Sequence, residues 1–191
     1  MEKFDDLLRL TLEKAKTNRA KFGYSGADRF AQCALVIGPN LESATLPIQW
    51  GSNREKRALM TAISLAAKDA NASAVLLIND TRWCESEKFT DYFHIAPISE
   101  IGLEAWQEEY GEIIRGIYGG SMGNLPRELW NEALIVSGKG PLVGEKSVIA
   151  FYREGRNDSV EWIENPMKTS GGDIQTKMYM LDDWWETTTK Q

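Results

Sequence analysis

Basic residues are in the minority in this chain of 191 residues. Lysine and arginine number 22 against 28 aspartates and glutamates, so the net charge is −6 and the pI is near 5.0. Nucleic acids and anionic membranes are bound through a local surplus of Lys and Arg, which neutralises their phosphates. The sequence therefore predicts no nucleic-acid partner and no membrane partner.

Long apolar runs and cysteines are also scarce. The longest candidate for a membrane span, Ala72–Ile78, is far shorter than the roughly 20 apolar residues needed to cross a bilayer. The first ten residues are acidic where a secretory signal would be basic. Cys33 and Cys84 are the two cysteines, too few for the disulfide framework of a small secreted protein. We therefore expect a cytoplasmic location.

Apolar residues make up 42% of the chain, which is enough for a buried core, and their spacing predicts the first elements. Residues 3–22 have the period of an amphipathic helix. Residues 32–50 contain two short apolar segments around a Pro39-Asn40 turn, which is typical of an antiparallel hairpin. Pro47 cannot donate a ladder hydrogen bond, so we expect its strand at an edge of the sheet or bulged there.

A helix and a buried strand are expected next. Ser52 and Glu55 have the spacing of a capping box, which predicts a helix over residues 53–71. Ala74–Ile78 is apolar without alternation, and such a strand is covered on both faces and usually central. If this strand runs parallel to the one before the helix, the crossover between them should be right-handed.

The second half of the chain predicts a helix and three strands. Residues 81–97 fit either a helical turn or a short strand, and both alternatives stay open. The apolar spacing after Ser99 predicts a helix that ends at Gly119-Gly120. Apolar segments separated by turns then predict a meander of three strands, over residues 133–137, 146–153 and 159–164.

These elements predict an α+β (or α/β) fold in the order α-β-β-α-β-α-β-β-β. The sheet should be mixed and mostly antiparallel, with the helices mainly on one face. We expect a single domain over residues 1–165, in which residues 99–120 are an inserted helix. Residues 166–191 should form a C-terminal loop and docking tail.

The densest group of potential metal ligands follows the buried strand, where ligands often bind in α/β sheets. Carboxylates with one imidazole could hold Mg²⁺, Mn²⁺ or Zn²⁺. Asp80, Glu85 and His94 are the candidate catalytic residues, and Glu87, Asp91 and His94 are the candidate metal ligands. Acidic residues also cluster by chance in an acidic chain, and Asn79 and Asp80 could instead cap a turn. No cofactor is therefore predicted, and a divalent metal is the alternative.

Cys84 is a further catalytic candidate, because a thiolate beside His94 would be an activated nucleophile. Cys84 follows Trp83 and could equally be a small core residue. The segment GPLVGEKS at residues 140–147 has the residue types of a phosphate-binding loop but the wrong spacing. A strand rather than a helix should follow it, so we predict a plain hairpin turn there.

The seven tryptophans are many for a domain of this size. Core packing should take most of them. Aromatic side chains are also enriched where a partner covers a surface. We therefore predict an interaction surface in the tail, formed by Trp184, Trp185 and Tyr179.

Three segments of the chain carry a resemblance: ASAVLLINDTRW, RELWNEALIVSG and FYREG. They resemble a loosely defined set of uncharacterised bacterial and phage proteins, in which an apolar strand ending in an acidic residue and Trp precedes an Arg-Glu and a valine-rich strand. The resemblance covers residues 31–155, and the helix from Ser99 to Gly119 is an insertion relative to it. No activity is attached to that set, so it implies no functional residue.

No residue type or spacing imposes a reaction class, and whether the chain is an enzyme stays open. The first hypothesis is a non-enzymatic accessory or protein-interaction protein that binds itself, as a homodimer, or another protein. The alternative is a metal-dependent hydrolase with a carboxylate and histidine site after the central strand.

Overall fold

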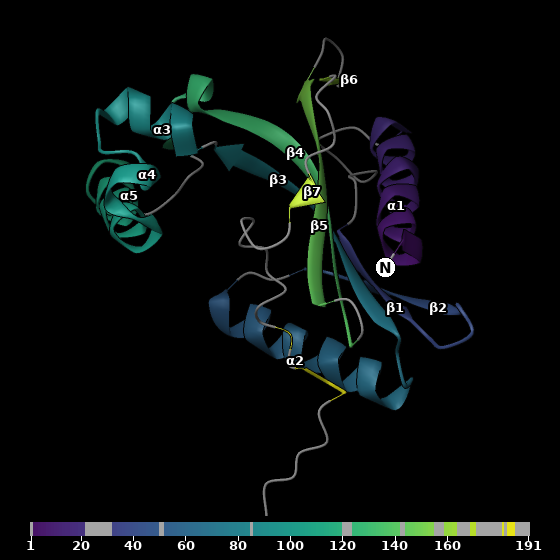
Figure 1. Ribbon diagram of the computed structural model, residues 1–191. Coiled ribbons are helices and arrows are strands. Elements are labelled where there is room, and N and C mark those ends of the chain that lie inside the picture. The colour runs from purple at the N-terminus through teal and green to yellow at the C-terminus, as the bar shows by residue number, and fades with distance from the viewer. Residues whose placement is uncertain are drawn as a thin grey trace, which may run out of the picture. The chain divides into compact units, whose positions relative to one another are not determined.

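The chain has an α+β fold, as predicted (Figure 1). A computed structural model describes residues 2–21, 32–49, 52–84, 86–119, 124–141, 144–154, 159–163, 169–170, 181 and 183–185. In chain order the helices and strands are α1 (Glu2–Lys21), β1 (Cys33–Ile37), β2 (Ser43–Pro47), α2 (Asn53–Asp69), β3 (Ala74–Cys84), α3 (Ser86–Phe93), α4 (Ile98–Ile101), α5 (Leu103–Tyr118), the 3-10 turn η2 (Arg127–Leu129), β4 (Trp130–Gly140), β5 (Gly144–Glu154), β6 (Val160–Trp162) and β7 (Thr169–Ser170).

The strands form one antiparallel sheet in the order β2-β1-β3-β4-β5-β6, with β7 paired to β5. Cys33 of β1 lies opposite Pro47 of β2 on one side and Ile78 of β3 on the other. The predicted hairpin is therefore confirmed, and Pro47 lies on the edge strand, where its missing N–H removes no ladder hydrogen bond. Because β2 and β3 both run antiparallel to β1, they are parallel to each other, and α2 connects them across β1.

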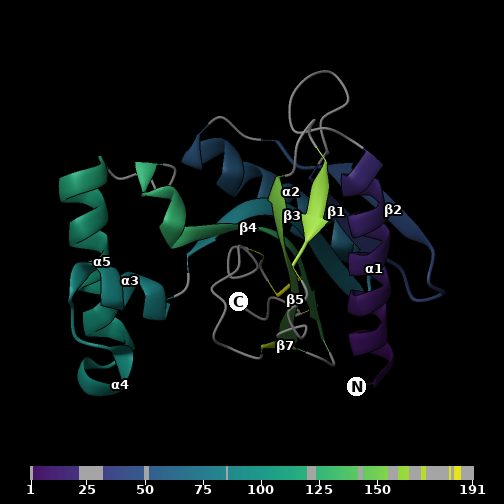
Figure 2. The ribbon, with the colours of Figure 1, turned by 90° about the horizontal axis from the view of Figure 1, so that it is seen from above.

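The apolar run of β3 is central and covered on both faces, as predicted. Val75 and Leu77 pack in a core cluster with α2, whereas Leu76 and Ile78 pack in a second cluster with α1. The two helices thus lie on opposite faces of the sheet (Figure 2). The expectation that the helices lie mainly on one face is wrong, because an uninterrupted apolar strand needs apolar cover on each side.

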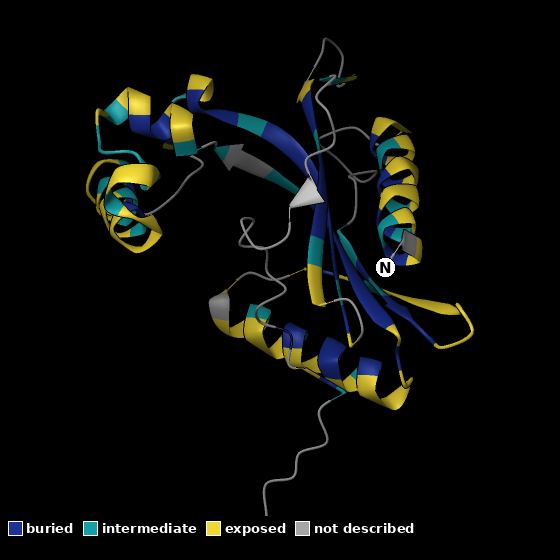
Figure 3. Cartoon of the chain, viewed as in Figure 1, coloured by how far each residue is buried: buried dark blue, intermediate teal, exposed yellow. Residues whose placement is uncertain are grey.

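Both covering helices present one apolar stripe to the sheet. The side chains of α1 that recur every three or four residues are buried, namely Phe4, Leu8, Leu12 and Ala15. Buried and exposed residues likewise alternate around α2 (Figure 3). The Ser52 hydroxyl accepts a hydrogen bond from the Glu55 backbone N–H at 3.2 Å, which confirms the predicted start of α2.

The stretch between residues 79 and 119 differs from the sequence expectation in two places. Strand β3 continues to Cys84, so Asn79 and Asp80 lie within a strand and do not cap a turn. Helix α3 then follows, which decides between the two alternatives for residues 81–97. The helix expected from Ser99 is divided into α4 and α5 by Gly102, which has a φ of 82°. Glycine adopts this backbone conformation at little cost in free energy, because it has no Cβ atom. Helix α5 ends at Gly119, which has a left-handed backbone conformation, as predicted.

The predicted meander of three strands is confirmed by β4, β5 and β6. Of the segment at residues 140–147, Gly140 is the last residue of β4, Pro141 is a turn residue, and residues 144–147 are the start of β5. A strand follows this connection, so the helix that a phosphate-binding loop requires is absent from residues 144–154.

The chain divides into two compact units. We call residues 1–80 with 134–191 the sheet unit and residues 81–133 the helical unit. The helix predicted as an insertion, over residues 99–120, lies within the helical unit. Within the described parts of the chain, no helix is long and apolar enough to cross a bilayer.

Gly138 of β4 permits the close approach of α1 to the sheet. A Cβ atom at this buried position would lie 2.7 Å from the Phe4 Cζ atom, 2.8 Å from the Leu76 Cδ2 atom and 2.9 Å from the Leu8 Cδ2 atom. These atoms belong to a packed core and cannot move apart without strain. Gly138 is thus the small residue on which this contact depends.

We therefore expect Gly138→Ala to lower the free energy of unfolding by about 1–3 kcal/mol, because the added methyl group overpacks the core. Denaturant unfolding followed by circular dichroism measures the change. Leu65→Ala, at an exposed position of α2, is the control and should change stability by less than about 0.5 kcal/mol. Equal stability of Gly138→Ala and the unchanged protein would contradict the close approach.

Candidate functional site

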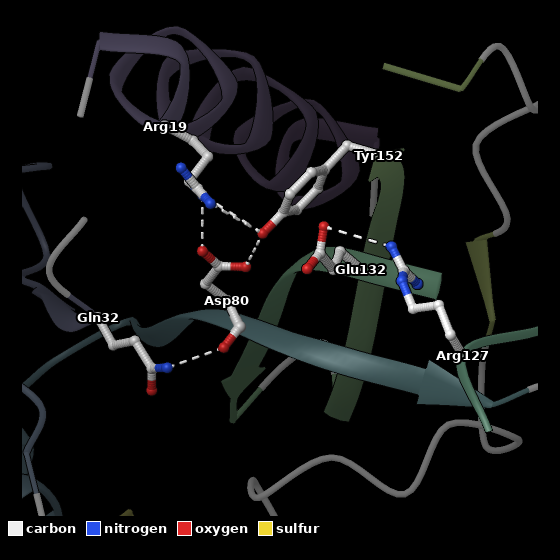
Figure 4. A network of polar contacts seen from close by, with 6 residues as sticks. All are labelled: Arg19, Gln32, Asp80, Arg127, Glu132 and Tyr152. Carbon is white, nitrogen blue, oxygen red and sulfur yellow. Dashed lines mark hydrogen bonds and ion pairs between the residues drawn. The ribbon is translucent and has the colours of Figure 1, made fainter. Parts of the chain in front are cut away.

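A buried polar network joins α1, β3 and β5 (Figure 4). Arg19 in the last turn of α1 is 1% exposed. Its Nε atom donates a hydrogen bond to Asp80 Oδ2 at 2.7 Å, and its Nε and Nη2 atoms lie 3.3 Å from the Tyr152 hydroxyl. The Tyr152 hydroxyl donates to Asp80 Oδ1 at 2.5 Å. Both carboxylate oxygens of Asp80 therefore accept hydrogen bonds from within the sheet unit.

Strand alternation brings these groups together. Asp80 follows Leu76 and Ile78 on the face of β3 that packs against α1, because side chains two residues apart share a face. Tyr152 has the same relation to Val148 on β5. A further hydrogen bond at 2.9 Å, from Gln32 Nε2 to the backbone oxygen of Asp80, attaches the chain segment before β1 to the same point.

The electrostatics of the network favour an ionised arginine and a neutral phenol. Burial by itself lowers the pKa of Arg19, but the hydrogen bond with Tyr152 and the charge of Asp80 outweigh it, so the pKa is raised. Burial, and then the hydrogen bond and charge of Asp80, raise the pKa of Tyr152. Tyr152 therefore acts as a hydrogen-bond donor, and the network is a satisfied ion pair suited to holding three elements together.

The predicted metal ligands lie on and after α3, in the helical unit. Glu87, Asp91 and His94 are all exposed, and His94 follows the helix with a positive φ of 54°. In the portion of the chain that the structure describes, no three His, Cys, Asp or Glu side chains gather closely enough to hold a metal ion. The residues predicted as one site are thus not brought together, and Glu85 lies outside the described residues.

Cys84 packs against the aromatic core of the helical unit. That core contains Phe89 and Trp106, whose indole N–H donates to the Thr90 hydroxyl at 2.9 Å. Of the two alternatives for Cys84, a nucleophile beside His94 or a small core residue, the structure favours the core residue. His94, by contrast, is exposed. Burial, with a smaller contribution from the charge of an ionised Cys84, raises the pKa of the neighbouring Tyr110 to about 12.

The tail tryptophans are bound to the chain's own core. Trp184 is 7% exposed, lies in the cluster beneath α2, and donates its indole N–H to the Ala72 backbone oxygen at 3.1 Å. Trp185 packs against Trp184 with ring centroids 4.6 Å apart. Trp184 is therefore not available as the predicted interaction surface, because the apolar face of α2 already covers it. Tyr179 lies outside the described residues.

A second ion pair lies in the helical unit (Figure 4). Arg127 approaches the buried carboxylate of Glu132 at 3.9 Å, donates to the Trp130 backbone oxygen at 3.0 Å, and stacks over the Trp130 ring with 3.9 Å between the guanidinium carbon and the ring centroid. The Trp130 indole N–H donates to the Leu125 backbone oxygen. These contacts order the turn η2 at the start of β4.

Arg19, Tyr152 and Glu132 are among the buried residues with polar groups that sequence reasoning missed. A signal for Arg19 was present in the chain. It lies four residues after Ala15, so it continues the apolar stripe of α1 and must face the sheet. A basic residue on such a stripe requires a buried acidic partner.

No family model, no curated protein and no solved structure matches the chain. The resemblance to bacterial and phage proteins therefore stays a prediction.

We expect Asp80→Asn to destabilise the sheet unit by about 3–5 kcal/mol, because Arg19 would remain buried without a counter-charge. Glu13→Gln is the matched control, since Glu13 forms an ion pair with Lys16 at 3.0 Å on the exposed side of α1 and such pairs contribute at most about 1 kcal/mol. Denaturant unfolding compares the two variants. Losses of similar size would show that the buried network does not hold the elements together.

Tyr110 should titrate late in the folded protein. The pKa of an unfolded tyrosine is about 10, and that of Tyr110 is about 12. The stability that neutral Tyr110 contributes is therefore fully present below about pH 10 and is lost as the pH rises toward 12. The ultraviolet absorbance of tyrosinate, titrated for the unchanged protein and for Tyr110→Phe, should differ by one group with a midpoint near 12. A difference curve centred near pH 10 would contradict the burial of Tyr110.

Proposed function

We propose that this chain is a non-enzymatic protein-interaction protein and that its helical unit provides the binding surface. The observation that carries the proposal is the exposure of large apolar side chains there. Tyr92, Leu103 and Ile117 are 45%, 52% and 65% exposed. They are three of the six exposed large hydrophobic residues among those described, in a unit that is just over a quarter of the chain. Leu103 and Ile117 lie at opposite ends of α5, about 21 Å apart along its axis, so a partner that covers both would extend along the length of the helix.

The polar chemistry of the described residues supports the same reading. Asp80 is held by Arg19 and Tyr152, so a role as a general base or metal ligand would require this network to open. Such opening would leave the charge of Arg19 buried and unpaired. This network thus has the character of a structural clamp.

The partner is either a different protein or a second copy of this chain. The tail is a poor place for it, because Trp184 is buried against α2. The helical unit is better suited, since its aromatic core supports a rigid surface. Ring contacts join Phe89 to Trp106 and to Tyr110, with centroids 5.9 and 4.6 Å apart. A cytoplasmic location stays a prediction.

A photo-crosslinking residue at Ile117, in cells that make the protein, tests the proposal. It should form an adduct with one partner, identified by mass spectrometry, and the same residue at Leu41 in the sheet unit should not. With the purified partner, the variant Tyr92→Ser, Leu103→Ser, Ile117→Ser should bind at least about tenfold more weakly, because a buried apolar contact contributes 1 kcal/mol or more at an interface. Sedimentation at several concentrations distinguishes self-association from a different partner.

The matched control is Leu10→Ser, Leu41→Ser, Leu65→Ser, which removes three exposed apolar side chains from the sheet unit. Equal loss of binding in the two triple variants would refute the helical unit as the surface. The alternative hydrolase predicts a different result. Thermal melting in Mg²⁺, Mn²⁺ or Zn²⁺ would then differ from melting in EDTA, and His94→Ala would abolish the difference.

A further inference from the structure

We propose that β2 forms the interface of a symmetric dimer, in which the outer edges of this strand from two copies of the chain pair antiparallel. The inference does not rest on the proposed function, because β2 belongs to the sheet unit. Strand β2 ends the strand order, and no other described strand pairs with its outer side. Ser43, Ala44 and Thr45 are all exposed, as Figure 3 shows along this strand. An exposed edge of this kind can add a further strand.

Hydrogen bonds at the two ends of the β1–β2 ladder determine which backbone groups of β2 face outward. The Gly38 N–H donates to the Glu42 oxygen at 2.8 Å, and the Ile48 N–H donates to the Gln32 oxygen at 2.9 Å. Residues 42 and 48 therefore direct their backbone polar groups toward β1. The register between them is continuous, and the direction of these groups alternates along an antiparallel strand. Residues 44 and 46 consequently also face β1, whereas residues 43, 45 and 47 face the open edge.

The outward groups of β2 are complementary to those of a second copy. A two-fold axis at Ala44 places Ser43 of each copy opposite Thr45 of the other. In this register the outward N–H and C=O groups of both residues all form hydrogen bonds, because residues that face each other in this way exchange two of them. Closed two-fold dimers bury the same surface of each copy. The occupant that this edge fits is therefore another β2.

Pro47 and the turn before β2 support the same register. Pro47 faces outward but has no N–H to donate, and the two-fold axis places it opposite Leu41 of the second copy. The Leu41 N–H is already used within the turn, where it donates to the Gly38 oxygen at 3.2 Å. The position that lacks a donor thus faces the position whose donor is occupied, and the pairing leaves neither copy with an unsatisfied N–H there.

Leu41 itself is a second, independent observation. It is 77% exposed, which is the highest value among the large hydrophobic residues described as exposed. Its φ of 65° lies in the left-handed region, which bulky residues rarely adopt and which glycine or asparagine would occupy with less strain. A leucine at this position is explained by an apolar contact. In the dimer it would lie beside the Pro47 ring of the second copy.

The distribution of charge allows two sheet units to approach each other. Residues 81–133 contain ten acidic and four basic residues, whereas the other 138 residues contain eighteen of each. The sheet unit therefore has no net charge. Strand β2 contains no charged residue, although charged side chains are a usual protection of an edge strand. By contrast, β6 at the other end of the strand order is three residues long and contains Glu161.

Analytical ultracentrifugation of the full-length protein at several concentrations should show an equilibrium between monomer and dimer. Thr45→Pro should raise the dissociation constant of the dimer at least about tenfold, because one outward N–H is lost from each copy. That N–H makes no hydrogen bond to β1, so the circular dichroism spectrum should not change. Thr45→Val keeps the N–H and is the matched control. A protein that sediments only as a monomer, or equal dissociation constants for the two variants, would refute the interface.

Two charge variants test the position of the axis without a proline. Ala44 is exposed, and in the dimer it lies opposite Ala44 of the second copy. Ala44→Lys and Ala44→Glu should each be monomeric, because like charges would face each other directly. An equimolar mixture of the two should form a heterodimer, which native mass spectrometry detects. Dimers of either variant alone, or a mixture without heterodimers, would overturn the inference.

This inference and the proposed function can fail separately. A dimer that is lost in Thr45→Pro and retained in the variant Tyr92→Ser, Leu103→Ser, Ile117→Ser belongs to β2. The opposite pattern assigns self-association to the helical unit and rejects the β2 interface. A crosslinking residue at Leu41 should reach only a second copy of this chain, so it remains the control for a different protein bound at the helical unit.

Discussion

The buried contact of Arg19 with Asp80 and Tyr152 is the constraint on which the sheet unit depends. It joins residues that are 61 and 133 positions apart in the chain. Each of the three side chains hydrogen-bonds to the other two, and removal of the Asp80 carboxylate would leave the charge of Arg19 unpaired in the core. The network therefore specifies where the end of α1 lies against β3 and β5, while the apolar stripe of α1 supplies most of the burial. A polar contact of this kind contributes to the choice of one register, because a strand shifted by one residue would turn Asp80 away from Arg19.

Tryptophan side chains contribute to the cores of both units. Three of the seven tryptophans, Trp106, Trp130 and Trp184, are buried in the protein's own cores, and their indole N–H groups all donate hydrogen bonds. An aromatic-rich sequence therefore does not by itself indicate an interaction surface. Among the described residues of the helical unit, the large apolar side chains that are exposed are a tyrosine, a leucine and an isoleucine, and the same unit carries the whole net charge of the chain.

The contrast between these two regions supports the proposed function. In the sheet unit, the half-buried carboxylate of Asp80 is paired with Arg19 and accepts hydrogen bonds on both oxygens. In the helical unit, the carboxylates of Glu109 and Glu112 on α5 are exposed. Groups that are already satisfied stabilise a fold, whereas accessible charges beside apolar side chains are able to recognise a partner.

Local patterns of the sequence determined much of the fold. The capping box at Ser52, the edge position of Pro47, the central β3 and the end of α5 at Gly119 each follow from residues adjacent in the chain. The tertiary structure alone decided that α1 and α2 cover opposite faces, that Asp80 pairs with Arg19 and Tyr152, and that Trp184 is buried beneath α2. These features join residues that are distant in sequence. Strand register and helix packing determine which of these residues meet, and the local periodicity of apolar residues contains no information about either.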